Sequence, residues 1–416
     1  MLVPHPSRHR QRWVSVDKGN IPLYNLERIA SKGENEVETK VKSQALKEFT
    51  EAVETLANPT IRSWREQGGK VVTYNCSYVP EEIITAAGLV PLRMRAPGST
   101  GTELSDTYLS NINCSFCRHV FNMALRGDYE FIEGAVWAST CDHSRRIFDN
   151  WKRKVGTPFT HMMSLPKKTT DVQVGWWREE LANLKEALEK HLGVTIADDK
   201  LREAIKTHNE TRRLLRQLYE LRKKDAPPIT GADALAVVVA STAMPKERFN
   251  QMLKELLEDL MGAEGIKGYR ARVMIVGGIL DDPDFIKVIE NEGGLVVTDS
   301  QCVGTRSFWT DVDVGGDPLT ALARWYLQDK PACHRMFDQT ANRSKFVRDM
   351  VKEFKVDGII GERLVFCDFW TVEHYLLRTE LKAETPYLSL DREYLWAGTI
   401  GQLRTRAQAF LERVER

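Results

Sequence analysis

The spacing of apolar residues divides the chain into four parts. Short apolar runs typical of buried strands alternate with helical patterns over residues 61–165 and again over residues 266–416. Residues 166–265 carry only helical patterns, and residues 1–60 form an N-terminal arm that ends in a helix. The alternation predicts two mostly parallel sheets covered by helices, with a helical domain between them.

The same pattern places the individual elements. The predicted strands are 70–74, 91–95, 134–139 and 160–165 in the first α/β part, and 272–276, 294–298, 356–360 and 385–390 in the second. The predicted helices outside the helical domain are 38–56, 80–89, 108–125, 143–153, 284–292, 317–327, 344–354, 370–381 and 401–414.

Composition and charge narrow the class of protein. The 416 residues include 59 basic and 58 acidic ones, so the net charge of +1 gives no general attraction to nucleic acid or to an anionic membrane. No run of about 18 apolar residues occurs, and the basic N-terminus lacks the apolar stretch of a secretory signal. We therefore expect a cytoplasmic protein that binds neither nucleic acid nor membranes.

Four of the seven cysteines lie just beyond the carboxyl end of a predicted strand. These are Cys76, Cys141, Cys302 and Cys367. In an open α/β sheet this edge is where ligands bind, and a neighbouring helix N-terminus favours the thiolate form of a cysteine. Two of the four begin the same Cys-Asp dipeptide, in ASTCDHSRR (138–146) and LVFCDFWTVE (364–373). The repetition indicates that two distant segments converge on one centre.

The other three cysteines extend this set. Cys114 and Cys117 form a C-x-x-C pair in NINCSFCRHV, and Cys333 lies in a loop of the second α/β part. Each α/β part can therefore supply three thiolates to a shared centre, which fits one or two iron–sulfur cubanes that are held by three cysteines each. The candidate metal ligands are Cys76, Cys114, Cys117, Cys141, Cys302, Cys333 and Cys367.

Other kinds of cysteine site compete with this interpretation. A structural zinc ion would use Cys114, Cys117, Cys141 and His143, although no second close cysteine pair supports it. A thioredoxin-like pair would follow a strand and open a helix, whereas helical residues are expected upstream of this pair. Any single cysteine can also be a small buried core residue. The chain has neither a phosphate-binding loop nor a dinucleotide fingerprint, so we do not expect it to hydrolyse ATP or to bind NAD in the usual way.

Several motifs in combination resemble a known family. The segments NCSYVPEEIITAAGLVPLRMR, NCSFCR, ASTCDHSRR, VDGIIGERLVFCDF and GQLRTRAQAFLERVE follow one another along the chain. From about residue 50 to the C-terminus the chain resembles the D-component type of the 2-hydroxyacyl-CoA dehydratase and benzoyl-CoA reductase family, including its double-cubane relatives. The resemblance implies two flavodoxin-like lobes with an iron–sulfur cluster at their interface. It also implies a separate iron–sulfur ATPase that donates single electrons.

The resemblance also suggests which thiols hold the cluster. In simpler members three cysteines hold one 4Fe-4S cluster, and the motif positions in this chain are Cys114, Cys141 and Cys367. The chain carries four further cysteines, Cys76, Cys117, Cys302 and Cys333. The surplus favours the double-cubane branch, because an 8Fe-9S cluster needs about six thiolates. One of the seven is then not a ligand, and the sequence leaves open which one.

The preferred hypothesis is an iron–sulfur oxidoreductase that reduces a small substrate at a double-cubane cluster, with ATP hydrolysed by a separate activator protein. The first alternative is a 4Fe-4S catalytic subunit of a benzoyl-CoA reductase or 2-hydroxyacyl-CoA dehydratase that acts on a CoA thioester. The second is a zinc-stapled scaffold protein without catalysis. We expect a homodimer, with a heterodimer with a paralogue as the alternative. The substrate and the proton donors stay open.

Overall fold

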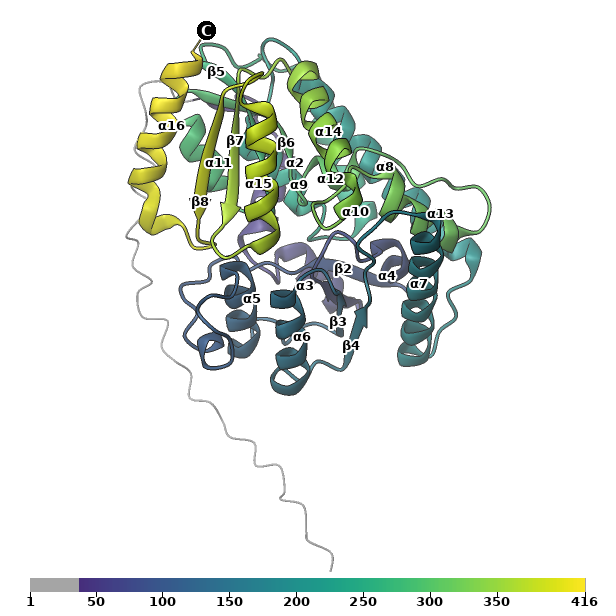
Figure 1. Ribbon diagram of the computed structural model, residues 1–416. Coiled ribbons are helices and arrows are strands. Elements are labelled where there is room, and N and C mark those ends of the chain that lie inside the picture. Colours follow the sequence, from purple (N-terminus) through teal and green to yellow (C-terminus); the bar gives the residue numbers. More distant parts are fainter. Residues whose placement is uncertain (1–36, 416) are drawn as a thin grey trace, which may run out of the picture. The chain divides into compact units, whose positions relative to one another are not determined.

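The protein is an α/β molecule with two parallel sheets (Figure 1). The computed structural model describes residues 37–415, so most of the predicted N-terminal arm lies outside the described residues. Each sheet has four strands, in the order β2-β1-β3-β4 in the first and β6-β5-β7-β8 in the second. The predicted fold class is therefore confirmed, whereas the domain boundaries stay a prediction.

All eight predicted strands are present, with ends that shift by a few residues. The first sheet contains β1 (Lys70–Tyr74), β2 (Leu89–Arg93), β3 (Gly134–Ala138) and β4 (Phe159–Met163). The second contains β5 (Ala271–Val276), β6 (Gly294–Ser300), β7 (Gly358–Leu364) and β8 (Tyr387–Arg392). The central strands are buried along nearly their whole length, because helices cover both faces of a parallel sheet.

Most strands are followed by helices, and the middle of the chain is helical, as predicted. The helices of the α/β parts are α2 (Gln44–Glu54), α3 (Pro59–Glu66), α4 (Glu81–Ala86), α5 (Ser115–Arg126), α6 (Asp142–Lys154), α11 (Pro283–Glu290), α12 (Thr305–Phe308), α13 (Pro318–Arg324), α14 (Thr340–Glu353), α15 (Asp368–Leu381) and α16 (Ile400–Val414). The middle part contains α7 (Asp171–Leu192), α8 (Asp198–Arg222), α9 (Gly231–Ala240) and α10 (Lys246–Met261). A π-helical turn, η2 (Trp325–Asp329), follows α13.

Two predicted helices begin later than the sequence pattern indicated. The helix predicted for 38–56 begins at Gln44, where the Ser43 hydroxyl accepts a hydrogen bond from the amide of Leu46. The helix predicted for 108–125 begins only at Ser115, because Cys114 is its N-cap. The expectation of helical residues directly upstream of the C-x-x-C pair was therefore wrong. The pair opens a helix after a series of turns, not after a strand.

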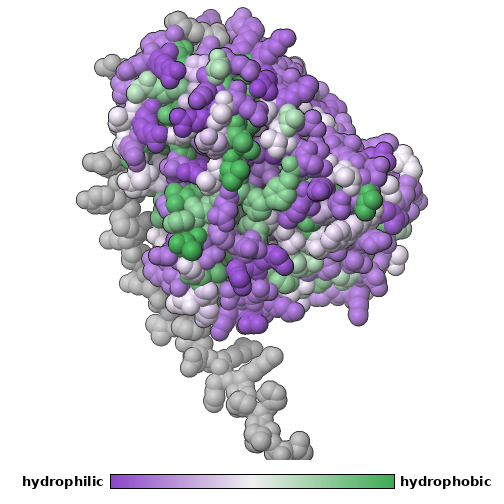
Figure 2. Space-filling model, viewed as in Figure 1, coloured by the Kyte–Doolittle hydropathy of each residue, from purple (hydrophilic) through white to green (hydrophobic). Residues whose placement is uncertain are grey.

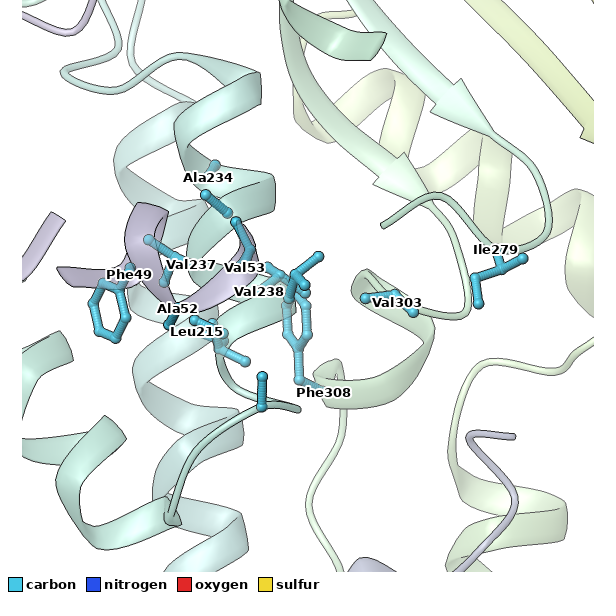
Figure 3. Packing of buried hydrophobic residues seen from close by; sticks show 14 of the residues in the cluster. Phe49, Ala52, Val53, Leu215, Ala234, Val237, Val238, Ile279, Val303 and Phe308 are labelled. Carbon is cyan, nitrogen blue, oxygen red and sulfur yellow. The ribbon is translucent and has the colours of Figure 1, made fainter. Parts of the chain in front are cut away.

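The main hydrophobic core joins the helical part to both sheets. Figure 3 shows Phe49 and Val53 of α2 packed beside Val237 of α9. The same cluster contains Val303 and Phe308, which lie just after β6. The core thus fixes the segment that leaves the carboxyl end of β6. Among residues 37–415, no helix is both long enough and apolar enough to span a membrane.

The carboxyl ends of the strands set the place of the candidate site. In Figure 1 the arrowheads of β7 and β8 point toward the side of the first lobe where α5 and α6 lie. The segments after β1 and β3 of the first sheet and after β5, β6 and β7 of the second line one cavity. This is the sheet edge at which open α/β folds bind their ligands.

Candidate metal centre

One cavity collects six of the seven cysteines. Its free volume is about 90 Å³, and part of the cavity is open to solvent. Its wall contains Cys76, Cys114, Cys117, Cys141, Cys302 and Cys367. Apolar side chains, including Phe116 and Leu364, line part of the wall, and the remainder carries polar and charged groups such as Arg93 and Arg335.

Three of these cysteines occupy the same position relative to a helix. Cys114, Cys141 and Cys367 are the N-caps of α5, α6 and α15. The amide of Ser144 donates to Sγ of Cys141 at 3.4 Å, so this thiol already accepts a hydrogen bond from the first turn of its helix. A helix N-terminus carries unsatisfied N–H groups and a partial positive charge, which stabilise a thiolate. We call these three residues the cap group.

The thiols of the cap group perturb one another. Burial raises the pKa of Cys367 to about 12, and the neighbouring Cys114 and Cys141 add to the rise. Burial also raises the pKa of Cys141, to which Cys114 contributes. Without a metal, therefore, a negative charge on one of these thiols makes ionisation of the others less favourable. A cationic metal centre would relieve that repulsion by accepting all three as thiolates.

Cys117 lies beside the cap group and is a hydrogen-bond donor to one of its thiols. It lies in the first turn of α5, and a hydrogen bond from its thiol lowers the pKa of Cys114 to about 5. The same hydrogen bond, together with burial, raises the pKa of Cys117 far above its ordinary value. Cys117 therefore acts as a protonated donor to Cys114.

The remaining thiols form a second group. Burial raises the pKa of Cys302, and Cys76 and Cys333 raise it further, against the lowering effect of Arg93 and Arg306. Cys333 follows the π-helical turn and is 4% exposed. It packs in one apolar cluster with Cys76 and Tyr78 of the first lobe. We call Cys76, Cys302 and Cys333 the cation group, because buried basic side chains surround them.

The two groups do not follow the lobes of the chain. The sequence suggested that each α/β part can supply three thiolates to a shared centre. In the structure Cys367 of the second lobe joins Cys114 and Cys141 of the first, and Cys76 of the first lobe joins Cys302 and Cys333 of the second. Each group therefore spans the lobe interface.

Basic side chains approach the cation group closely. Nη2 of Arg93 lies 3.9 Å from Sγ of Cys302, and Nη1 of Arg335 lies 3.4 Å from Sγ of Cys333. Burial opposes ionisation of Cys333, but His334 and Arg335 lower its pKa well below the ordinary value. Burial lowers the pKa of Lys330 to about 8, while the nearby Cys76 and Cys333 act to raise it.

Several buried donors on the cavity wall have no protein acceptor. Within the described part of the chain, Nε of Arg93, Nε of Arg335, Nε2 of His334 and Nε1 of Trp370 make no hydrogen bond. Buried N–H groups are rarely left without a partner. An iron–sulfur cluster is anionic, and its sulfurs accept hydrogen bonds. The donor set and the thiols therefore fit such a cluster, although metal binding by these cysteines stays a prediction.

The arrangement differs from that expected of a single metal ion. Cys114, Cys117, Cys141 and His143 all line the cavity, as the zinc hypothesis requires. Within residues 37–415, however, no three side chains of His, Cys, Asp or Glu are gathered in a way that could hold one ion. Thiols spread around a cavity suit a cluster of several metals better than a point-like tetrahedral site.

His143 closes the cap group on its exposed side. The amide of Cys114 donates to Nδ1 of His143 at 3.1 Å, which leaves the proton of the neutral imidazole on Nε2. Nε2 lies 3.8 Å from Oδ2 of Asp368. The hydrogen bond with the Cys114 side chain raises the pKa of His143. From the sequence, a solvated or core role is favoured over a proton-donating role for both His143 and His334.

The sequence interpretation missed the basic residues of the site. Arg93 and Arg335 line the cavity, whereas Arg306 and Lys330 lie near the thiols of the cation group. The four residues come from three separate segments of the chain. One hint of this arrangement is present in the sequence. In KPACHRMF (330–337), basic residues flank Cys333 on both sides.

Comparison with known proteins identifies the family. Residues 76–414 match the family model of the 2-hydroxyglutaryl-CoA dehydratase D-component, so the chain belongs to this family and the resemblance seen in the sequence is confirmed. The chain is similar to one of the subunits of benzoyl-CoA reductase from Thauera aromatica, with 29% identity over 85% of this chain and 94% of that protein. It is also similar to the beta subunit of (R)-2-hydroxyglutaryl-CoA dehydratase from Acidaminococcus fermentans, with 25% identity over 88% and 98% of the two chains.

Proposed function

We propose that this chain is an iron–sulfur oxidoreductase subunit that holds a double-cubane cluster. In this proposal one half of the cluster binds to Cys114, Cys141 and Cys367, and the other binds to Cys76, Cys302 and Cys333. Cys117 is the thiol left over. The observation that carries the proposal is that six thiols line one cavity while Cys333 packs beside Cys76 of its wall, so that the thiols other than Cys117 form two groups of three.

The chain's own residues prepare the site for reductive chemistry. When bound, a cluster of this type supplies single electrons at low potential. Phe116, Leu364 and Trp370 exclude water from the cavity wall, which strengthens every electrostatic interaction inside it. His143 holds a proton on Nε2 at the partly exposed side of the cap group, from where it can be given to a small bound substrate.

The proposal includes two protein partners. A separate ATP-hydrolysing iron–sulfur protein donates the electrons, and a second copy of this chain completes a homodimer. Figure 2 shows apolar side chains on the molecular face where α5 and α15 lie. Exposed apolar residues of these segments include Ile112, Phe366 and Val372. Exposed apolar surface of this kind is typical of a protein-binding face.

A second candidate keeps only the cap group as ligands. The named relatives are subunits of enzymes whose names contain CoA compounds. The resemblance seen in the sequence implies that Cys114, Cys141 and Cys367 are the ligand positions of the simpler members. In this version the chain holds one 4Fe-4S cluster and binds a CoA thioester. Cys76, Cys302 and Cys333 are then buried thiols without a metal.

The iron and acid-labile sulfide content of anaerobically purified protein tests the proposal. We expect about eight irons per chain, unchanged in Cys117→Ser and reduced to about half in Cys333→Ala. About four irons in the native chain, unchanged by Cys333→Ala, would overturn the double cubane in favour of the second candidate. Zinc without sulfide would overturn both and support the scaffold hypothesis.

A further inference from the structure

The two thiol groups differ in the charges and dipoles that surround them. Each thiol of the cap group stands at the N-terminus of a helix of at least twelve residues. A helix N-terminus is equivalent to about half a positive charge, so three of them together supply about one and a half charges. The negative charge of a cluster half held here is met by these backbone dipoles and by one complete charge, Arg335, which acts to lower the pKa of Cys141 and Cys367 as well as that of Cys333.

Acidic side chains offset part of this positive charge. Asp142 and Asp368 directly follow Cys141 and Cys367 in the two Cys-Asp motifs. Their side chains are 84% and 83% exposed, so both carboxylates are well solvated. The repeated dipeptide thus places one negative charge next to each of two cap-group thiols.

The cation group is surrounded by complete positive charges. Arg93 and Arg335 contact Cys302 and Cys333 directly. Lys330 is 4% exposed, and its ammonium group donates to the carbonyl of Ser77 at 2.6 Å and lies 3.8 Å from the ring centre of Tyr78. Arg306, also 4% exposed, is held by the carbonyls of Ser300 and Gly277.

In the described part of the chain, no Asp or Glu oxygen lies within ion-pair distance of Arg93, Arg306, Lys330 or Arg335. By contrast, the buried Arg343 and Arg392 pair with the buried Glu373 and Glu362. Burying a cation without a counter-charge is costly, so these four buried charges favour an anion beside them.

We infer that the cluster half held by Cys76, Cys302 and Cys333 is reduced before the half held by Cys114, Cys141 and Cys367. The inference rests on the proposed double cubane. Reduction adds a negative charge. Arg335 is shared by the two groups, but Arg93, Arg306 and Lys330 act on the thiols of the cation group, so the added charge is stabilised more there than at the helix N-termini of the cap group. Asp142 and Asp368 oppose the added charge at the cap group alone. The first electron therefore resides on the cation side.

The inference is tested by a redox titration of the full-length, anaerobically purified protein, followed by electron paramagnetic resonance. The variants Arg93→Gln and Lys330→Met each remove one cation from the cation group. We expect them to lower the potential of the first reduction step more than that of the second. Asp368→Asn should raise the potential of the second step more than that of the first. Arg348→Gln, which removes an arginine that is paired with Glu384 at the surface, should leave both steps unchanged.

The outcomes separate this inference from the proposed function. A shift of the second step by Arg93→Gln or Lys330→Met, in protein that holds about eight irons, would overturn the reduction order but keep the double cubane. If these variants do not fold, Asp368→Asn decides alone because its side chain is exposed, and a shift confined to the first step overturns the order. Four irons and a single reduction step in the native protein would overturn the double cubane and the inference together.

Discussion

Arg392 and Glu362 form a buried ion pair at the carboxyl ends of β8 and β7, with Nε of the arginine 2.7 Å from Oε2 of the glutamate. The other carboxylate oxygen of Glu362 accepts hydrogen bonds from the amide of Gly278 at 3.1 Å and from Nε2 of Gln301 at 3.3 Å. Glu362 thus connects the loops after β5 and β6, and the second of these loops carries Cys302.

Replacing Arg392 should therefore destabilise the whole second lobe. Arg392→Met leaves the fully buried carboxylate of Glu362 without its cation, which costs about 3–5 kcal/mol of unfolding free energy. Urea denaturation of the metal-free protein measures this loss. The double variant Arg392→Met/Glu362→Gln should recover part of it, because no charge then remains buried. Arg348→Met, which breaks an exposed pair with Glu384, should cost less than about 1 kcal/mol. Equal losses in the two single variants would contradict this account.

The contact between Cys114 and His143 predicts an effect on metal retention. His143→Ala removes the acceptor of the Cys114 amide at the start of α5 and so loosens one proposed ligand. Loss of such a supporting contact typically weakens metal binding by about 10–100-fold. We expect iron to leave the loaded His143→Ala protein faster when a chelator is added under anaerobic conditions.

Two further variants make that measurement specific. His143→Gln retains a side-chain acceptor and should lose iron at a rate closer to that of the native protein. His161→Gln, on β4 and outside the cavity wall, should have no effect. If His143→Ala and His161→Gln release iron equally fast, the Cys114 contact does not support the site.

The sequence predicted which cysteines lie at the carboxyl edge of the sheets, but it did not predict the buried basic side chains. Cys76, Cys141, Cys302 and Cys367 could be placed because strand and helix periods locate the carboxyl ends of parallel strands, which share one edge. The grouping of Cys76 with Cys333 could not be predicted, because it depends on how two lobes meet. The start of α5 at Ser115 was missed for another reason. The turn residues before it do not break the apolar period, and a cysteine N-cap is not a recognised signal.

The buried cations were missed for a physical reason as well. Arginine and lysine are normally exposed, so a sequence pattern assigns Arg93 or Lys330 to a solvated surface. They are buried here because thiols from other segments stand next to them, and no local pattern records that.

The backbone before Cys367 carries a strained residue. Phe366 has a φ of +63°, a conformation that costs a residue other than glycine about 1–2 kcal/mol, and its side chain is largely exposed. We expect Phe366→Gly and Phe366→Asn to retain the native unfolding free energy or exceed it, because both residues tolerate this φ. The β-branched Phe366→Val should lose about 1–2 kcal/mol. Thermal and urea unfolding compare the three variants, and a valine variant as stable as the glycine variant would contradict the strain.

The burial of His374 predicts how the stability of the protein depends on pH. Burial, assisted by Arg363, lowers the pKa of His374 to about 4, and within the described residues neither ring nitrogen has a hydrogen-bond partner. In the unfolded chain a histidine titrates near ~6.5. The folded state therefore binds fewer protons than the unfolded state between these values. The contribution of His374 to stability is complete above pH ~6.5 and is lost as the pH falls toward 4.

Between pH 7 and pH 5 this loss amounts to about 2 kcal/mol for a single histidine with these pKa values. His374→Phe keeps an aromatic ring beside Tyr387, whose ring centre lies 5.6 Å away, and removes the titrating group. Its unfolding free energy should therefore fall by about 2 kcal/mol less than that of the native protein when the pH is lowered from 7 to 5. His191→Gln, which alters a histidine paired with Glu133, should not reduce the acid sensitivity in this way. A native-like pH dependence in His374→Phe would show that His374 is already solvated or protonated in the folded protein.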